Sequence, residues 1–256
     1  MSPYNSKRTR NLYDPRSDKP FKISRSKIDL FIECARCFYM DRRLGVGRPP
    51  GFPFNLNNAV DHLLKLEFDQ YRLSGLPHPM MTENKIDAIP YQNENLDKWR
   101  ANASGVQYLH EDTNFTITGA IDDVWINSNT ELIVVDYKAT SKNETIDKLN
   151  DTWHIAYKRQ MEIYQWLLKK NEYQVSNIGY FVYCNARRDK EAFNSILDFE
   201  INVIPYEGNT FWIEKKIFEI KDCLQGDNLP ESSYRCDYCK YIGSVHSELL
   251  DLDIIN

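Results

Sequence analysis

The segment Phe115–Lys138 constrains the fold of this chain more than any other stretch. Residues 115–126 alternate in polarity and are rich in β-branched side chains, residues 127–130 suit a tight turn, and residues 131–138 alternate again. This pattern predicts two antiparallel strands joined by a hairpin. The same reading predicts, in order, a helix, two strands and a helix at residues 153–170, 177–185, 195–205 and 210–224. The order indicates an α/β fold, with a central mixed β-sheet flanked by helices.

The N-terminal half is predicted to be helical and partly irregular. Apolar residues recur at helical spacing over about residues 27–43 and 57–72, with a stiff Gly- and Pro-rich loop between them. The stretch 74–114 contains several prolines and predicts no clear element. For the domain organisation we expect a flexible basic arm, a single domain and a short tail, over residues 1–21, 22–246 and 247–256 respectively.

Charge and hydropathy place broad limits on the function. The chain has no apolar run long enough for a membrane span and begins with a polar, basic segment, so a cytoplasmic protein without a membrane partner is expected. Its net charge of -5 argues against a uniformly basic surface for nucleic acid, but a cleft needs only a local basic lining. Candidates for that lining, which are equally interpretable as solvated surface charges, are Arg42, Arg43, Arg48, Lys158, Arg159, Arg187, Arg188 and Lys190.

The end of the predicted hairpin carries acidic and basic groups suited to metal-assisted chemistry. The two-residue period of a strand places Asp136 and Lys138 on one face, and the partner strand brings Asp122 toward them. Two neighbouring carboxylates favour a cation between them, and Mg²⁺ or Mn²⁺ prefers oxygen ligands, including the backbone carbonyl of Tyr137. An Asp-x-Lys triplet alone also fits a strand that ends in solvent. The metal-site interpretation therefore depends on further motifs elsewhere in the chain.

Four short motifs in order resemble the PD-(D/E)xK nuclease superfamily, in particular its RecB-like branch. In chain order they are His62 within a predicted helix, Gly119-Ala-Ile-Asp122, Asp136-Tyr-Lys138 and Gln160-Met-Glu-Ile-Tyr164. The branch includes CRISPR adaptation nucleases and the nuclease domains of recombination helicases. The resemblance runs from about Ser24 to Tyr241, and Ile121-Asp122 replaces the Pro-Asp of the superfamily's name.

The resemblance implies a restriction-endonuclease-like core and a metal-dependent deoxyribonuclease. By this likeness Asp122 and Asp136 are metal ligands, Lys138 is the catalytic lysine, and His62 completes the shell of Mg²⁺ or Mn²⁺. Gln160 and Tyr164 would position the nucleic acid or the lysine. It further implies exonuclease-like action on DNA single strands or ends, in repair, recombination or defence. No Gly-Lys-Ser/Thr nucleotide loop occurs, so any helicase partner would be a separate protein. From the residues alone, His62 and Gln160 also fit hydrogen-bonded side chains buried by amphipathic helices.

Two Cys-x-x-Cys pairs lie near opposite ends of the chain. In a reducing compartment, Cys34, Cys37, Cys236 and Cys239 indicate metal binding rather than disulfides. Four thiolates suit an iron–sulfur cluster or a tetrahedral Zn²⁺, and either would clasp the N-terminal segment to the C-terminal one. Some RecB-like members hold an iron–sulfur cluster with one N-terminal and three C-terminal cysteines, whereas this chain has two and two. The resemblance implies an iron–sulfur cluster here, and Zn²⁺ is the alternative. His246 is a candidate substitute ligand, whereas Cys184 and Cys223 are predicted to be small buried apolar residues.

Two other function classes compete with a nuclease. One is a non-catalytic nucleic-acid-binding module on the same fold, and the other is an iron–sulfur scaffold protein. The intact group of Asp122, Asp136 and Lys138 argues against both, because neither class needs two carboxylates and an ammonium together.

Overall fold

The structure, a computed structural model, describes residues 4, 7–252 and 254 and divides into two compact units. Unit 1 comprises residues 1–52, 109–116 and 212–256, and unit 2 comprises residues 53–108 and 117–211. The single domain over 22–246 stays a prediction. No helix in the described part of the chain has the length and apolarity needed to cross a membrane.

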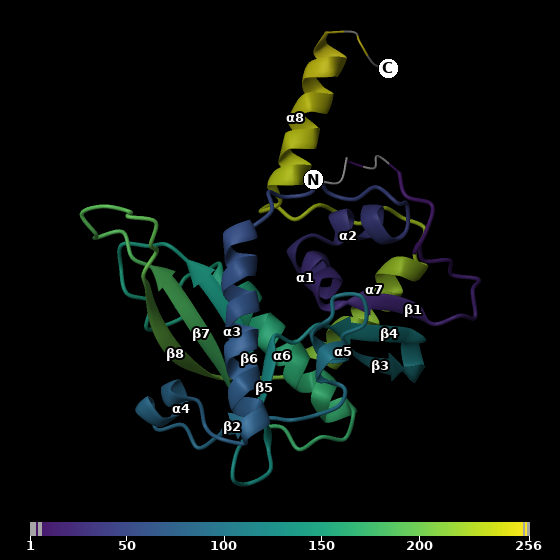
Figure 1. Cartoon of the computed structure of the whole chain (residues 1–256). Helices are drawn as coiled ribbons and strands as arrows, with labels where there is room; N and C mark the ends of the chain where they lie inside the picture. Colours follow the sequence, from purple (N-terminus) through teal and green to yellow (C-terminus); the bar gives the residue numbers. More distant parts are fainter. Residues whose placement is uncertain (1–3, 5–6, 253, 255–256) are drawn as a thin grey trace. The chain divides into compact units, whose positions relative to one another are not determined.

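Unit 2 is built on a five-stranded mixed sheet, which confirms the predicted fold class (Figure 1). Its strand order is β2-β5-β6-β7-β8. The β6–β7 pair is parallel and the other three pairs are antiparallel. The strands are β2 (Ile89–Pro90), β5 (Asp123–Ile126), β6 (Leu132–Thr140), β7 (Ile178–Ala186) and β8 (Phe199–Glu207).

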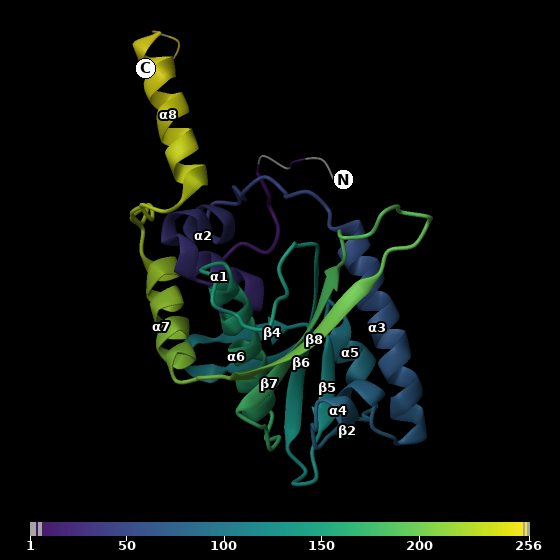
Figure 2. The same ribbon diagram turned by 90° about the vertical axis from the view of Figure 1, so that its left-hand side faces the viewer.

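Two helices cover opposite faces of this sheet, α3 (Asn55–Ser74) and α6 (His154–Lys170) (Figures 1 and 2). Alternation along β6 explains the arrangement. Ile133, Val135 and Tyr137 point toward α3 and share a core with its Leu64 and Phe68. Asp136 points the other way and is hydrogen-bonded from α6. The central strand is therefore buried on both sides, and its polar end is fixed between two helices.

The single strand predicted over residues 115–126 is wrong. The chain forms β4 (Phe115–Gly119) and β5, separated by residues 120–122. A short helix, α5 (Leu96–Arg100), forms hydrogen bonds with the backbone of this break. Ile121 donates its N–H to the Trp99 carbonyl, and the Arg100 Nε donates to the Asp122 carbonyl, both at 3.0 Å. The stretch 74–114, which was predicted to be irregular, therefore contains the helix α5 that bonds to this break. It also contains α4 (Pro79–Glu83) and β3 (Val106–His110).

Unit 1 is mainly helical, and the continuous helix predicted over 27–43 is also wrong. Its elements are β1 (Phe21–Ser24), α1 (Arg25–Glu33), α2 (Ala35–Arg42), a 3₁₀ turn (Glu111–Thr113), α7 (Trp212–Gln225) and α8 (Asp237–Asp251). The helix breaks at Cys34, whose backbone is extended (φ −162°, ψ 105°). α1, α2 and α7 pack together, whereas α8 buries none of its side chains. Tyr13, within the predicted arm, is buried and donates its N–H to Arg42.

Candidate active site

The two acidic residues and the lysine predicted from the sequence come together at the end of β6. The β5–β6 register pairs Asp123 with Val135, so Asp122 lies opposite Asp136. Because β5 begins only at Asp123, the Tyr137 N–H donates to the side chain of Asp122, at 3.0 Å from its Oδ2. The Lys138 ammonium forms an ion pair with Asp136 Oδ2 and lies 4.5 Å from the ring centroid of Tyr157.

Burial dominates the electrostatics of Asp136. Its side chain is 0% exposed, and the ammonium of Lys138 is the ion-pair partner of its Oδ2. Burial raises the pKa of Asp136 to about 7, with Asp122 adding to the rise and Lys138 opposing it. Burial acts to lower the pKa of Lys138, but the two carboxylates outweigh it and the net shift is upward. Two converging carboxylates match the oxygen donors that a hard divalent cation takes.

Helix α6 brings the predicted Gln160 and Tyr164 to the same carboxylate. The Gln160 Nε2 donates to Asp136 Oδ1 at 2.7 Å and lies 3.0 Å from the Tyr164 hydroxyl. Both side chains are buried. Tyr164 also explains Gly119, because a Cβ at that position would lie 2.7 Å from the Tyr164 Cε1. The motif Gly119–Asp122 and the motif Gln160–Tyr164 are thus in direct contact.

On α3, the structure brings a different residue to the site from the one predicted. His62 is exposed, and its neighbours Leu63 and Leu66 are 63% and 49% exposed, so that stripe does not face the core. Lys65 and Asp61 occupy the inward side instead. The Lys65 Nζ lies 2.8 Å from Asp61 Oδ2 and 3.5 Å from Asp122 Oδ1. Burial raises the pKa of Asp61, and the charge of Asp122 raises it further.

Sequence analysis missed Asp61 and Lys65, because the sequence of α3 offers two candidate faces and does not choose between them. Asn57, Asp61, Leu64, Phe68 and Arg72 repeat at intervals of three and four, which marks one helical face. This face mixes polar and apolar residues, so the more apolar stripe next to it looked like the buried one. Asn57 is also on the correct face, since its Nδ2 donates to the Ala139 carbonyl at the end of β6, at 2.6 Å.

A buried charge network below the site was also missed. Asp123 is 0% exposed and accepts hydrogen bonds from Arg72, Arg100 and the Tyr137 hydroxyl, the last at 2.7 Å. Asp123 follows Asp122 directly, and by strand alternation it points to the opposite face. Its partners connect α3, α5, β5 and β6, so it fixes the backbone that carries the two acidic residues above it.

In unit 1, the four predicted cysteines cluster as expected. All four Sγ atoms lie within 4.8 Å of one another. Cys37 Sγ lies 3.5 Å from Cys236 and 3.6 Å from Cys239, and Cys34 Sγ lies 3.7 Å from Cys239. The cluster links the α1–α2 break to the start of α8. His246 is exposed, farther along α8. The prediction for the other two cysteines holds for Cys184, which is buried, while Cys223 is half-buried.

Comparison with known proteins yields one informative match. No curated protein matches the chain. A solved structure described as "Crystal structure of SSO0001" aligns with 88% of this chain and 85% of its own, at 15% identity and a TM-score of 0.38, a likeness too low to carry an argument. A family model described as the PD-(D/E)XK nuclease superfamily matches residues 22–244, a range that includes the four motifs and all four cysteines. The chain therefore belongs to the PD-(D/E)XK nuclease superfamily.

Proposed function

We propose that this protein is a metal-dependent deoxyribonuclease of the RecB-like branch that hydrolyses DNA phosphodiester bonds. One observation carries the proposal: Asp122 and Asp136 converge beside the Lys138 ammonium at the buried end of β6. Two carboxylates close together repel each other and one of them is fully buried, so their retention points to a cation that binds both.

The residues that would hold the divalent cation are Asp122, Asp136 and the carbonyl of Tyr137. When bound there, Mg²⁺ or Mn²⁺ supplies Lewis-acid activation of the nucleophilic water and of the phosphate. The predicted further ligand His62 is exposed on α3, and neighbouring helical residues point about 100° apart, so His62 and Asp61 lie on different sides of that helix. Asp61 has the facing position and keeps a partner for Lys65 when a cation takes over Asp122.

The chain's own residues supply orientation and charge in this mechanism. Lys138 stays protonated beside Asp136, since the two carboxylates raise its pKa, and its ammonium can stabilise negative charge that develops on the phosphate. Gln160 holds one oxygen of Asp136, and Tyr164 in turn contacts Gln160. The Tyr137 N–H fixes the rotamer of Asp122. Each acidic group is therefore oriented before substrate arrives.

Digestion of end-labelled DNA tests the proposal. Wild-type protein should degrade single- or double-stranded DNA with Mg²⁺ or Mn²⁺, and Lys138→Ala should reduce the rate by at least about 100-fold. Lys215→Ala, an exposed lysine of α7 in unit 1, is the matched control and should retain full activity. Undiminished cleavage by Lys138→Ala rejects the assignment of the lysine. Binding without cleavage by the wild-type protein favours the non-catalytic DNA-binding alternative.

Exonuclease-like action, in repair, recombination or defence, is the finer part of the proposal and rests on the RecB-like motifs alone. The same end-labelled substrates examine it, because digestion from an end releases labelled mononucleotides or short products first. Internal cuts release long labelled fragments instead. A separate helicase partner would supply single strands to the enzyme.

We further propose that the four cysteines bind a metal, and the sulfur separations favour Zn²⁺ over the iron–sulfur cluster. Tetrahedral Zn²⁺ with bonds of about 2.3 Å places its ligand sulfurs about 3.8 Å apart. Three of the separations here are 3.5, 3.6 and 3.7 Å, and all four sulfurs lie within 4.8 Å of one another. A cluster encloses several iron and sulfide ions and needs wider spacing. Colourless protein with one bound zinc agrees with this proposal. Brown protein with iron and sulfide refutes the preference for zinc.

A further inference from the structure

Arg48, in the loop that follows α2, contacts the cysteine site directly. Its Nη2 donates to Cys236 Sγ at 3.5 Å. Burial acts to lower the pKa of Arg48, but the charges of Cys37 and Cys236 act with Glu33 to raise it, and the net shift is upward. The other side of the guanidinium is fixed, since Nη1 donates to Glu33 Oε2 at 2.8 Å. The guanidinium carbon lies 4.7 Å from the ring centroid of Tyr238. The guanidinium thus contacts a sulfur of the C-terminal Cys-x-x-Cys pair directly, while Glu33 and Tyr238 fix its position, and all of these residues belong to unit 1.

We propose that Arg48 is the counter-charge of the four-cysteine site, a positioning residue that holds the thiolates and offsets their charge when a metal is bound. The inference rests on the metal proposed for these cysteines. Four thiolates carry four negative charges, and a divalent ion neutralises only two of them. Cys34 and Cys236 are 1% and 5% exposed, so water screens little of the remainder. Hydrogen bonds to charged sulfur and a fixed cation lower the cost of that burial.

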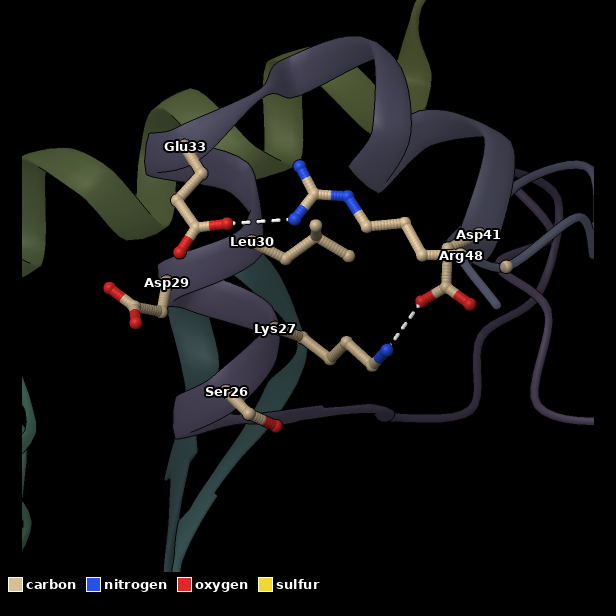
Figure 3. Close-up of a pocket in the computed structure, with 8 residues that line it drawn as sticks. Ser26, Lys27, Asp29, Leu30, Glu33, Asp41 and Arg48 are labelled. Carbon is tan, nitrogen blue, oxygen red and sulfur yellow. Dashed lines mark hydrogen bonds and ion pairs between the residues drawn. The ribbon is translucent and has the colours of Figure 1, made fainter. Parts of the chain in front are cut away.

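The acidic residue Asp41 near Arg48 already has another cationic partner, so the charge of Arg48 is available to the cysteine sulfurs. Its side chain lines a cavity of about 250 Å³, together with Leu30, Lys27 and Asp41 (Figure 3). Within this cavity Asp41 already has an ion pair with Lys27, at 2.8 Å, so it does not depend on Arg48. Figure 3 shows Arg48 reaching past Leu30 to Glu33. Because one side of Arg48 borders a cavity, a shorter side chain there should enlarge existing space and leave the fold intact.

Cobalt and zinc titrations of the metal-free, reduced full-length protein test this inference. The variants are Arg48→Gln, which removes the charge, and Arg48→Lys, which keeps the charge but lacks the planar guanidinium with its paired N–H donors. Arg36→Gln is the matched control. Arg36 lies between Cys34 and Cys37 and donates to the Pro230 carbonyl at 2.8 Å, so it ties the same two segments together without touching sulfur. The measurements are metal affinity by chelator competition and the sulfur-to-cobalt charge-transfer absorption.

Arg48→Gln should weaken metal binding by roughly 10- to 100-fold, the usual effect of removing an outer partner of a metal ligand. Its charge-transfer band should move to lower energy, because sulfur that loses a hydrogen bond gives up electron density more easily. Arg48→Lys should lie between, and Arg36→Gln should keep the wild-type band. If Arg48→Gln fails to fold, judged by circular dichroism, the band and affinity of Arg48→Lys decide.

The outcomes separate this inference from the metal proposal. A wild-type protein that binds neither Co²⁺ nor Zn²⁺ at its cysteines overturns both. Wild-type affinity and an unchanged band in Arg48→Gln overturn the role of Arg48 alone. Equal losses of affinity in the Arg48→Gln and Arg36→Gln variants, with the band unmoved in both, would mean that Arg48 merely braces the loop, and this result also overturns the proposal.

Discussion

Replacing Asp136 by Asn is predicted to stabilise the protein in the absence of divalent cations at about pH 8. In the folded state this carboxyl is fully buried, with the Lys138 ammonium beside one of its oxygens. Burial raises its pKa from 3.8 to about 7 even though Lys138 opposes the shift. Ionised Asp136 is therefore a cost to folding that Asn, a neutral side chain of the same shape, does not carry.

The magnitude follows from proton linkage. A pKa of about 7 in the folded state against 3.8 is a difference of about three units, each equivalent to roughly 1.4 kcal/mol. Since the folded-state pKa of Asp136 is the higher one, its contribution is full below about pH 3.8 and is lost as pH rises through about 7. At pH 8 the wild-type protein should then be less stable than the Asn variant by at most about 4 kcal/mol, which is roughly 10 °C in melting temperature. This is an upper limit, because the variant leaves the buried Lys138 with Asp122 as its remaining acidic partner.

Thermal melts across pH, without added Mg²⁺ or Mn²⁺, measure this effect. The wild-type protein should lose stability between about pH 4 and pH 8 relative to Asp136→Asn. Added Mn²⁺ should raise the melting temperature of the wild-type protein but not of the variant. Asp122→Asn is the control, because Asp122 is 23% exposed and accepts the Tyr137 N–H, so no comparable gain is expected there. An Asp136→Asn protein that melts below wild type at pH 8 would refute the reasoning.

Three further predictions concern packing and metal loss. Gly119→Ala should cost roughly 1–3 kcal/mol in urea unfolding and lower nuclease activity, because the new Cβ displaces Tyr164; wild-type stability would contradict the tight contact. Asp123→Asn should cost roughly 3 kcal/mol in the same assay, since it leaves the buried guanidinium of Arg72 without its acidic partner there, and a loss below 1 kcal/mol would show that the network is dispensable. Cys236→Ser should abolish metal retention and raise amide exchange in α1, α2 and α8; unchanged exchange in α8 would argue against a clasp at the cysteines.

Local pattern was enough to place the residues of β6. A period of two requires Asp136 and Lys138 to share a face and Tyr137 to take the other, and the structure has this arrangement. The cysteine cluster was predictable for a similar reason. A Cys-x-x-Cys pair brings its two sulfurs close by local geometry alone, so only the meeting of the two pairs depended on the fold.

The two breaks in predicted elements could not be read from local pattern. Residues 115–126 have strand composition throughout, yet the chain leaves the strand at 120–122 because α5 satisfies the backbone there. The helix predicted over 27–43 breaks at Cys34 at the point where its sulfur joins the other three. In both places a partner distant in sequence outweighs the local preference, which differs between conformations by less than about 1 kcal/mol per residue.

The sequence by itself determined the superfamily, the identity of the acidic pair and lysine, and the four-cysteine group, because each depends on residue type at short spacing. The tertiary structure alone decided that Asp61 faces the site while His62 faces solvent. The rotation of α3 about its axis is set by Leu64 and Phe68 packing on β6, and neighbouring helical residues point about 100° apart. Only packing of the whole face against the sheet fixes that angle, so no short motif could reveal it.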